Sequence, residues 1–354
     1  MMSAAHIDGW LRDRALPLWA GTGIDPATGT AWEALDHTGT PLRQMTRRLR
    51  VQSRQAFCFA TLGQGGLARQ LFDWVMAHGF DPDTGHMAAQ MSPDMTILSA
   101  PNDLYDLAFA GFAAAALMRA GQDVGQDLAR IERAIASLRA PLGWFEDAHH
   151  RLPRRQNAHM HLFEMAVALY DVTRAPRFLA MADTCLALFR TRFVDPEGRL
   201  LEFYSADLTP LPAPDQAIEP GHIAEWIYLL DHYERVSGQD GGVDLALLWQ
   251  LVLARRDGAG LLPDQSDPAS STRRLWPQTE LLRAAGVMLS RGAATQADLT
   301  HILDGMWRDY LDTPVAGGWY DMRTSQGALV SDTMPASTFY HVVGALQAYK
   351  TALR

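Results

Sequence analysis

The sequence predicts an all-helical fold built from repeated helical hairpins. Apolar residues recur at three- and four-residue steps along most of the chain, and connectors rich in Gly, Pro and Asp separate these stretches. Of the 354 residues, 48% are hydrophobic and 20% are charged, which is the balance of a globular protein. Since no break in composition divides the chain, we expect a single domain over residues 1–354.

The helical pattern is clearest in stretches spread over the whole chain. They cover residues 55–80, 103–121, 161–173, 176–193, 221–236, 244–258, 279–292 and 340–353. Three connectors, FDPDTG at 80–85, VDPEGR at 194–199 and DPATG at 25–29, resemble one another and indicate a degenerate repeat. Such hairpins can bury their apolar stripes in a closed ring or in an open solenoid, and periodicity alone does not distinguish the two.

Charge and terminal composition exclude several classes of function. The formal net charge is −9 and the Lys and Arg residues are dispersed, so we expect no nucleic-acid partner. No apolar stretch is long enough to span a bilayer, and the N-terminus carries charges where a signal peptide is apolar, so we expect a cytoplasmic protein without a membrane partner. Cys58 and Cys185 lie in apolar helical patterns and are expected to be buried thiols.

The segment QNAHMHLFEM begins the third helical stretch with polar residues. On a helix Asn157 and His161 share a face, whereas His159 and His161 point to opposite sides. His159 and His161 should therefore not chelate one metal ion. For either histidine, the alternative is a hydrogen-bonded residue at a helix start.

A second group of polar residues occurs in EPGHIAEW. Pro220 and Gly221 end the preceding loop, and His222 and Glu225 lie three apart on one face of the helix that follows. A carboxylate beside an imidazole fixes its tautomer and raises its basicity, as a general base requires. The alternative is a capping pair. His232, further along this helix, is expected to be a solvated residue without a role.

Two more helix starts carry candidate residues. In RLWPQTE, Trp276 and Glu280 lie four apart, and an aromatic ring beside a carboxylate is a common way to hold a sugar, although a core tryptophan is the alternative. In MPASTFYH, Ser337 and Thr338 are expected to cap the last helix and to place His341 in its first turn. Polar groups at the starts of several helices imply one common rim.

The motifs QNAHMH, EPGHIAEW, RLWPQTE, GGWYD and MPASTFYH, in this order, resemble the N-acylglucosamine 2-epimerase superfamily from about Arg47 to the C-terminus. The likeness is closest in kind to members of the mannose isomerase and sulfoquinovose isomerase type. The resemblance implies an all-α fold, a six-hairpin α/α barrel with short β pieces in the rim loops. It also implies catalysis without a metal or other cofactor.

Carried over position by position, the resemblance assigns two groups of residues. His222 and His341 take the catalytic acid and base roles. The residues implied to line the sugar pocket are Arg54, Tyr105, Asn157, His161, Glu225, Trp276 and Glu280. One departure is Arg50, where the family often has an aromatic residue four positions before the pocket arginine. This departure bears on the substrate and not on the reaction.

The expected function is interconversion of an aldose and its ketose, of the mannose-to-fructose type, through a cis-enediolate. A 2-epimerase of N-acylglucosamine or a related sugar, and an isomerase of a 6-phosphorylated or sulfonated hexose, are the alternatives. The basic residues Arg43, Arg47, Arg48 and Arg50 could meet a phosphate or sulfonate, or could form a solvated helix face. The expected partner is a monosaccharide, and a homodimer is possible.

Three further classes stay open from the sequence. A glycoside hydrolase would need two carboxylates beside the scissile bond, and Glu225 and Glu280 are the obvious pair. A metal-dependent isomerase could use His161, His222, Glu225 and His341 as ligands. A sugar-binding protein without activity is the third class, against which the presence of both catalytic histidines argues.

Overall fold

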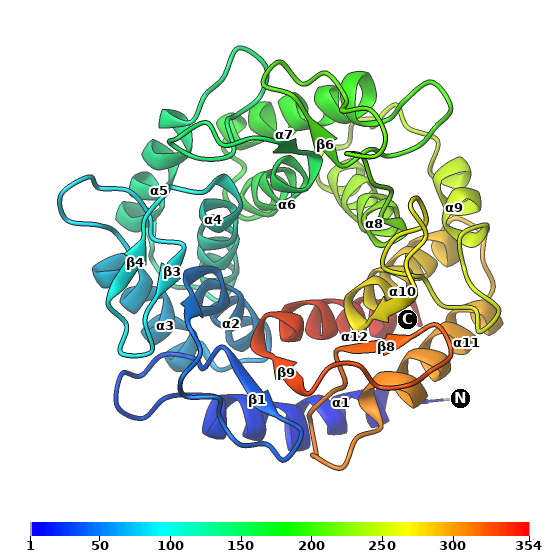
Figure 1. Ribbon diagram of the computed structural model, residues 1–354, viewed down its shortest axis with the longest axis horizontal. Helices are drawn as coiled ribbons and strands as arrows, with labels where there is room; N and C mark the ends of the chain where they lie inside the picture. Colours follow the sequence, from blue (N-terminus) through cyan, green and yellow to red (C-terminus); the bar gives the residue numbers. More distant parts are fainter. Residues whose placement is uncertain (1, 354) are drawn as a thin grey trace.

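The computed structural model describes residues 2–353, and its helices are arranged in two concentric rings around a central axis (Figure 1). The inner ring consists of α2 (Leu49–Thr61), α4 (Leu104–Arg119), α6 (Gln156–Thr173), α8 (Pro220–Ser237), α10 (Leu275–Ser290) and α12 (Phe339–Ala352). The outer ring consists of α1 (Ala4–Trp10), α3 (Gly65–His78), α5 (Gly125–Ser137), α7 (Pro176–Leu188), α9 (Leu245–Leu253) and α11 (Gln296–Met306). The all-helical prediction is confirmed.

Inner helices contact one another in chain order. α2 contacts α4, α4 contacts α6, and the series continues through α8 and α10 to α12, which in turn contacts α2. Each inner helix therefore has an inner neighbour on both sides, and a helix of the outer ring lies outside it (Figure 1). A helix enclosed in this way buries almost its whole circumference, and in α6 every residue from Ala158 to Leu169 is buried.

Short antiparallel strands lie in the loops at one end of the rings. They are β1 (Ala34–Asp36), β2 (Arg47–Arg48), β3 (Gln90–Met91), β4 (Ile97–Ser99), β5 (Arg154–Arg155), β6 (Phe203–Tyr204), β7 (Thr272–Arg274), β8 (Met322–Thr324) and β9 (Thr333–Pro335). They pair as β1–β9, β2–β3–β4, β5–β6 and β7–β8. Since β2, β5 and β7 run directly into α2, α6 and α10, these small sheets mark the end at which the inner helices begin.

The three similar Asp connectors form related turns, of which the one at Asp195 is a residue shorter than those at Asp25 and Asp81. The side chains of Asp25, Asp81 and Asp195 each accept the backbone N–H two residues further on. Each turn closes on a glycine whose φ is 71°, 72° or 79°, a left-handed conformation that favours glycine. Asp257 makes a fourth such turn, which ends at Gly260 with a φ of 78°.

Aromatic side chains join the first and last parts of the chain. Trp19, in the π-helical segment Leu18–Thr22, stacks on Trp319 with 4.4 Å between ring centroids. Both indoles also stack on Phe339 at the start of α12. The pairing of β1 with β9 adds a backbone link between the same two regions. The N-terminal segment is thus part of the packed structure and not an appendage.

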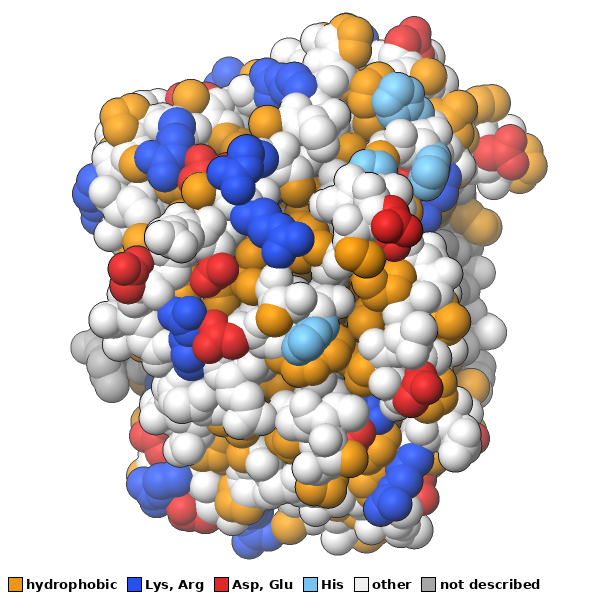
Figure 2. Space-filling view, turned by 90° about the vertical axis from the view of Figure 1, so that its left-hand side faces the viewer, with side chains coloured by type: hydrophobic (Ala, Val, Ile, Leu, Met, Phe, Trp, Pro, Cys, Tyr) orange, Lys and Arg blue, Asp and Glu red, His pale blue; other side chains and the backbone are white. Residues whose placement is uncertain are grey.

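The distribution of charged side chains and the burial of the two cysteines match the expectations from the sequence. On the face shown in Figure 2, Lys and Arg side chains are interspersed with Asp and Glu side chains. Within residues 2–353, no helix combines the length and the apolar character needed to cross a bilayer. Cys58 and Cys185 are both buried, as predicted.

Replacing Trp19 by alanine should lower the free energy of unfolding by about 3–5 kcal/mol, because it removes a buried indole from a stack of aromatic rings. Urea denaturation followed by circular dichroism measures the change. Leu98→Ala is the control, since Leu98 is 58% exposed and its loss should change stability by less than about 0.5 kcal/mol. Equal stability of the two variants would show that the Trp19 segment does not unfold with the rest of the chain.

Candidate active site

A cavity of about 360 Å³ opens at the end of the rings where the inner helices begin. The residues that line it are Arg48, Arg54, Tyr105, Asn157, His161, Glu219, His222, Glu225, Arg274, Trp276, Asp321, Pro335, Ser337, Thr338 and His341. Every site residue expected from the sequence except Glu280 thus lines this cavity. The volume lies within the range of small-molecule sites, about 300–1,000 Å³.

Most of the lining side chains come from the first turns of inner helices. His222 is the third residue of α8, and His341 is the third residue of α12. Asn157 and Trp276 are each the second residue of their helices, α6 and α10. Because helix N-termini carry partial positive charge, this end of the ring favours negative charge that develops inside the cavity.

The imidazole of His222 is held by carboxylates. Its Nδ1 lies 2.8 Å from Oε1 of Glu202 and 3.7 Å from Oε2 of Glu219. Burial acts to lower the pKa of His222, but the charges of these two carboxylates outweigh it and raise the pKa to about 9. His222 therefore carries a proton at neutral pH, and its Nδ1–H donates to Glu202.

The carboxylate partner of His222 was wrongly expected to be Glu225. Glu225 lines the cavity instead, and its buried Oε1 has no hydrogen-bond partner within residues 2–353. Burial raises the pKa of Glu225 well above its usual value, and the charges of Glu280 and Glu164 raise it further. A carboxyl group at the wall of a cavity, with one oxygen unpaired, is suited to a ligand hydroxyl. The carboxylate that binds His222 is Glu202, which lies directly before β6. The two residues are 20 positions apart in the chain, so no helical spacing relates them.

The imidazole of His341 is also held by a carboxylate. Its Nδ1 lies 2.8 Å from Oε1 of Glu280, whose Oε2 accepts a hydrogen bond from Nη1 of Arg283 at 2.8 Å. Burial lowers the pKa of His341 well below its usual value, and the nearby cations, Arg54 foremost, lower it further. His341 is therefore neutral at neutral pH, in contrast to His222.

Glu280 was expected to line the sugar pocket, and this expectation is wrong. Its side chain is fully buried and points at His341 from behind, outside the set of described residues that line the cavity. Trp276, four residues earlier, does line it, and its indole lies between the two histidines. Its ring centroid is 4.9 Å from that of His222 and 5.8 Å from that of His341.

Arg54 is fixed in the cavity by neutral partners. Its Nη2 donates to the hydroxyl of Tyr105 at 2.6 Å, and its Nη1 donates to the carbonyl of Ser337 at 3.2 Å. The guanidinium carbon lies 4.1 Å from the ring centroid of Phe109. Since no carboxylate pairs with Arg54 among the described residues, its charge is available to a ligand.

His161 and Asn157 complete the wall that α6 contributes. Nδ1 of His161 lies 3.0 Å from Oε2 of Glu164, and burial lowers the pKa of His161 to about 4, so its ring is neutral. Oδ1 of Asn157 is buried and has no partner in the described residues. Both side chains offer hydrogen-bonding groups to a polar ligand. His159 faces away, where its Nε2 accepts the backbone N–H of Trp144 at 3.2 Å.

Two expectations about the rim need correction. Ser337 and Thr338 do not cap α12 with their side chains, because Oγ1 of Thr338 donates to Oδ1 of Asp321 at 2.9 Å. The basic residues near position 47 do not act together either. Arg43 is exposed, whereas the other three pair with separate carboxylates: Arg47 with Asp25, Arg48 with Glu33 and Arg50 with Asp106.

Arg48, named above only as part of a basic cluster, lines the cavity, and so does Arg274, which was missed as a site residue. A repeated signal in the sequence could have found them, since Arg–Arg pairs stand directly before α2, α6 and α10 at 47–48, 154–155 and 273–274. In each pair the second arginine gives its backbone N–H and Nε to one carboxylate, which is Glu33, Glu146 or Asp264. The same loop geometry is therefore used at alternate inner helices.

Histidine and glutamate side chains that could hold a metal ion form three groups in the described residues. These are His161 with Glu164 and Glu225, Glu202 with Glu219 and His222, and Glu225 with Glu280 and His341. Hydrogen bonds already account for the closest approaches within them, such as those of His222 to Glu202 and of His341 to Glu280.

A protonated imidazole and a neutral imidazole that line one small cavity can act as a general acid and a general base. A model of the family described as N-acylglucosamine 2-epimerase (GlcNAc 2-epimerase) matches residues 30–345. The chain belongs to this family, and it is an enzyme that acts on sugars as an isomerase or a 2-epimerase.

The chain is also similar to individual proteins whose names are those of sugar isomerases and 2-epimerases. The chain is 34% identical over 385 residues to a protein named mannose-6-phosphate isomerase from Rhizobium meliloti (strain 1021), an alignment that covers 100% of this chain and 98% of the relative. The structure of cellobiose 2-epimerase from Spirochaeta thermophila DSM 6192 has a TM-score of 0.84 at 20% identity and covers 99% and 96% of the two chains. A D-mannose isomerase structure has a TM-score of 0.83 at 19% identity, with 98% and 96% covered.

Replacing Glu202 by glutamine should lower the pKa of His222, because it removes the nearest negative charge. A raised folded-state pKa stabilises the protein fully below the unfolded pKa, about 6.5, and this stabilisation is lost as the pH rises through about 9. Glu202→Gln should therefore cost about 1–3 kcal/mol of unfolding free energy at pH 6.5, and the difference should shrink toward pH 10. Urea denaturation at both pH values measures it.

The matched control is Glu197→Gln, which removes a carboxylate that is 66% exposed. Its effect should be small at both pH values. A cost for Glu202→Gln that stays constant with pH would show that Glu202 does not hold a proton on His222.

Proposed function

We propose that this enzyme interconverts a free aldose and its ketose, in the manner of mannose and fructose, through a cis-enediolate. The observation that carries the proposal is that His222 and His341 line one cavity of about 360 Å³, each with its Nδ1 2.8 Å from a buried carboxylate. We further propose that the two rings of helices form a closed α/α barrel of six hairpins, with the cavity at its mouth.

In this mechanism neutral His341 is the base. It removes the proton from carbon 2 of the open-chain sugar, and the electron pair moves through carbon 1 onto the carbonyl oxygen. The enediolate that forms is stabilised by the unpaired charge of Arg54, by protonated His222 and by the helix N-termini around the cavity. Asn157 and Glu225, each with an unpartnered buried oxygen, orient the sugar through its hydroxyls.

The second proton transfer decides between two outcomes. If His341 returns its proton to carbon 1 while the proton of the carbon 2 hydroxyl passes to the oxygen of carbon 1, the product is the ketose. If His222 delivers its proton to the other face of carbon 2, the product is the 2-epimer. The protonated state of His222 favours this epimerase as the second candidate. Product analysis distinguishes the two, since mannose would give fructose in the first case and glucose in the second.

The charges at the mouth of the cavity favour an uncharged hexose. Arg48 and Arg274 line the mouth, but each is already paired, with Glu33 and Asp264 respectively. A phosphate would therefore have to compete with a fixed carboxylate at each arginine. The relative named mannose-6-phosphate isomerase makes a hexose 6-phosphate the alternative substrate.

Replacing either catalytic histidine should nearly abolish turnover. His222→Gln and His341→Gln should each lower kcat by about 10²–10⁴-fold, because a positioned acid or base contributes that much. Glutamine can still donate a hydrogen bond to the carboxylate beside each ring, so both variants should fold, with His222→Gln the less stable because it loses the charge beside Glu202. His159→Gln, outside the cavity, is the control for kcat. Turnover within a factor of about three of the parent in both variants would mean that other groups transfer the proton.

Exchange of the carbon 2 proton with deuterated solvent tests the substrate class. Mannose should exchange and form fructose, whereas mannose 6-phosphate should react at least about tenfold more slowly, because its phosphate meets paired arginines at the mouth. Nuclear magnetic resonance of both sugars with equal enzyme measures the two rates. Faster exchange of the phosphate ester would assign the enzyme to phosphorylated hexoses.

A further inference from the structure

The two histidine–carboxylate pairs differ in the second side chain that donates a hydrogen bond to the carboxylate. Behind Glu280 stands Arg283, whose Nη1 donates to Oε2 at 2.8 Å, and both side chains are buried. Behind Glu202 stands Gln156, whose Nε2 donates to Oε2 at 2.9 Å. One carboxylate therefore has a full positive charge beside it, and the other has only a neutral amide.

We infer that Arg283 is a positioning residue that neutralises Glu280 and so keeps His341 free to accept a proton, whereas Gln156 leaves the charge of Glu202 to hold a proton on His222. This inference rests on the proposed function for the roles of the two histidines. The physical reason is simple. A carboxylate stabilises a neighbouring imidazolium only to the extent that its charge is not already compensated by another cation.

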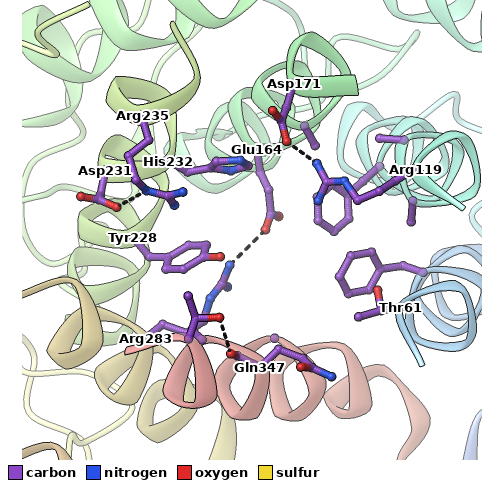
Figure 3. A pocket seen from close by; sticks show the side chains of 18 of the residues that line it. Thr61, Arg119, Glu164, Asp171, Tyr228, Asp231, His232, Arg235, Arg283 and Gln347 are labelled. Carbon is purple, nitrogen blue, oxygen red and sulfur yellow. Dashed lines mark hydrogen bonds and ion pairs between the residues drawn. The ribbon is translucent and has the colours of Figure 1, made fainter. Parts of the chain in front are cut away.

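Arg283 acts from outside the catalytic cavity. It belongs to the lining of a second cavity of about 700 Å³ at the opposite end of the ring, where the inner helices end (Figure 3). There its guanidinium lies 3.8 Å from the ring centroid of Tyr228, and its Nη2 lies 3.7 Å from Oε1 of Glu164. His232, expected to be solvated, in fact lines this rear cavity as well.

Several other ionisable groups surround His341 and must be considered. Those on the helices that form the centre of the ring are Arg54 on α2, His161 and Glu164 on α6, Glu225 on α8, Glu280 and Arg283 on α10, and Tyr340 on α12. Arg54 also opposes protonation of His341, but it lies on the catalytic side and stays in place when Arg283 is changed. A change confined to Arg283 therefore reports on the charge behind Glu280.

The test is the pH dependence of kcat/KM for the isomerised sugar in Arg283→Gln. Loss of this positive charge lets the Glu280–His341 pair bind a proton at higher pH, and in that state Nε2 of His341 cannot act as a base. The acidic limb of the profile should move upward by about 1–3 pH units. Arg283→Lys should restore most of the parent profile, because lysine keeps the charge.

Arg119→Gln is the matched control. Arg119 lines the same rear cavity but pairs with Asp171, so its loss should leave the acidic limb in place. If Arg283→Gln does not fold, Arg283→Ala purified with guanidinium ion provides the same comparison. Guanidinium can enter from the rear cavity into the space of the missing side chain, and its removal by dialysis should move the limb.

A second measurement does not depend on turnover. In protein labelled with ¹³C in its histidine rings, the resonance of His341, assigned through His341→Gln, should show a neutral ring throughout the stable pH range. In Arg283→Gln the same resonance should titrate at higher pH. If the resonance shifts but the parent turns over no hexose, the proposed function fails and the role of Arg283 stands. An unchanged titration, or a uniform loss of kcat without movement of the acidic limb, would overturn the inference.

Discussion

The structure depends on the pairing of ionisable groups at the centre of the helical ring. Glu164, Glu280 and Arg283 are almost completely buried there, beside the rings of His161 and His341. An isolated charge in such a place would cost several kcal/mol, so each group is stable only while its partners are present. The hydrogen bonds from Arg283 to Glu280, and from Tyr340 and His161 to Glu164, supply those partners.

The partners of these groups come both from the same helix and from other helices. Arg283 and Glu280 both lie on α10, and His161 and Glu164 both lie on α6. Glu280 on α10 holds His341 on α12, and Tyr340 on α12 holds Glu164 on α6. The catalytic geometry and the packing of the ring are thus set by the same contacts, and one cannot be altered without the other.

The sequence predicted the helices from their apolar periodicity, and most residues that line the cavity from motifs shared with the family. Apolar periodicity marked the helices, and residues three or four apart, such as Asn157 and His161, were correctly placed on one face. Local spacing gave wrong predictions where the hydrogen-bond partner of a side chain is distant in the chain. Glu202 lies 20 residues before His222, and the side chain of Glu280 turns toward His341, 61 residues away, instead of into the cavity. The Arg–Arg repeat was visible in the sequence, but its meaning depends on carboxylates in other loops.

The paired charges at the centre also act as a partition. The described residues that line the catalytic cavity and those that line the rear cavity are two separate sets, with Glu164 and Arg283 standing between them. No described residue lines both cavities, although Glu164 and Arg283 of the rear cavity bind His161 and Glu280. A small molecule in the rear cavity would therefore touch the groups that support the catalytic imidazoles without entering the space of the sugar.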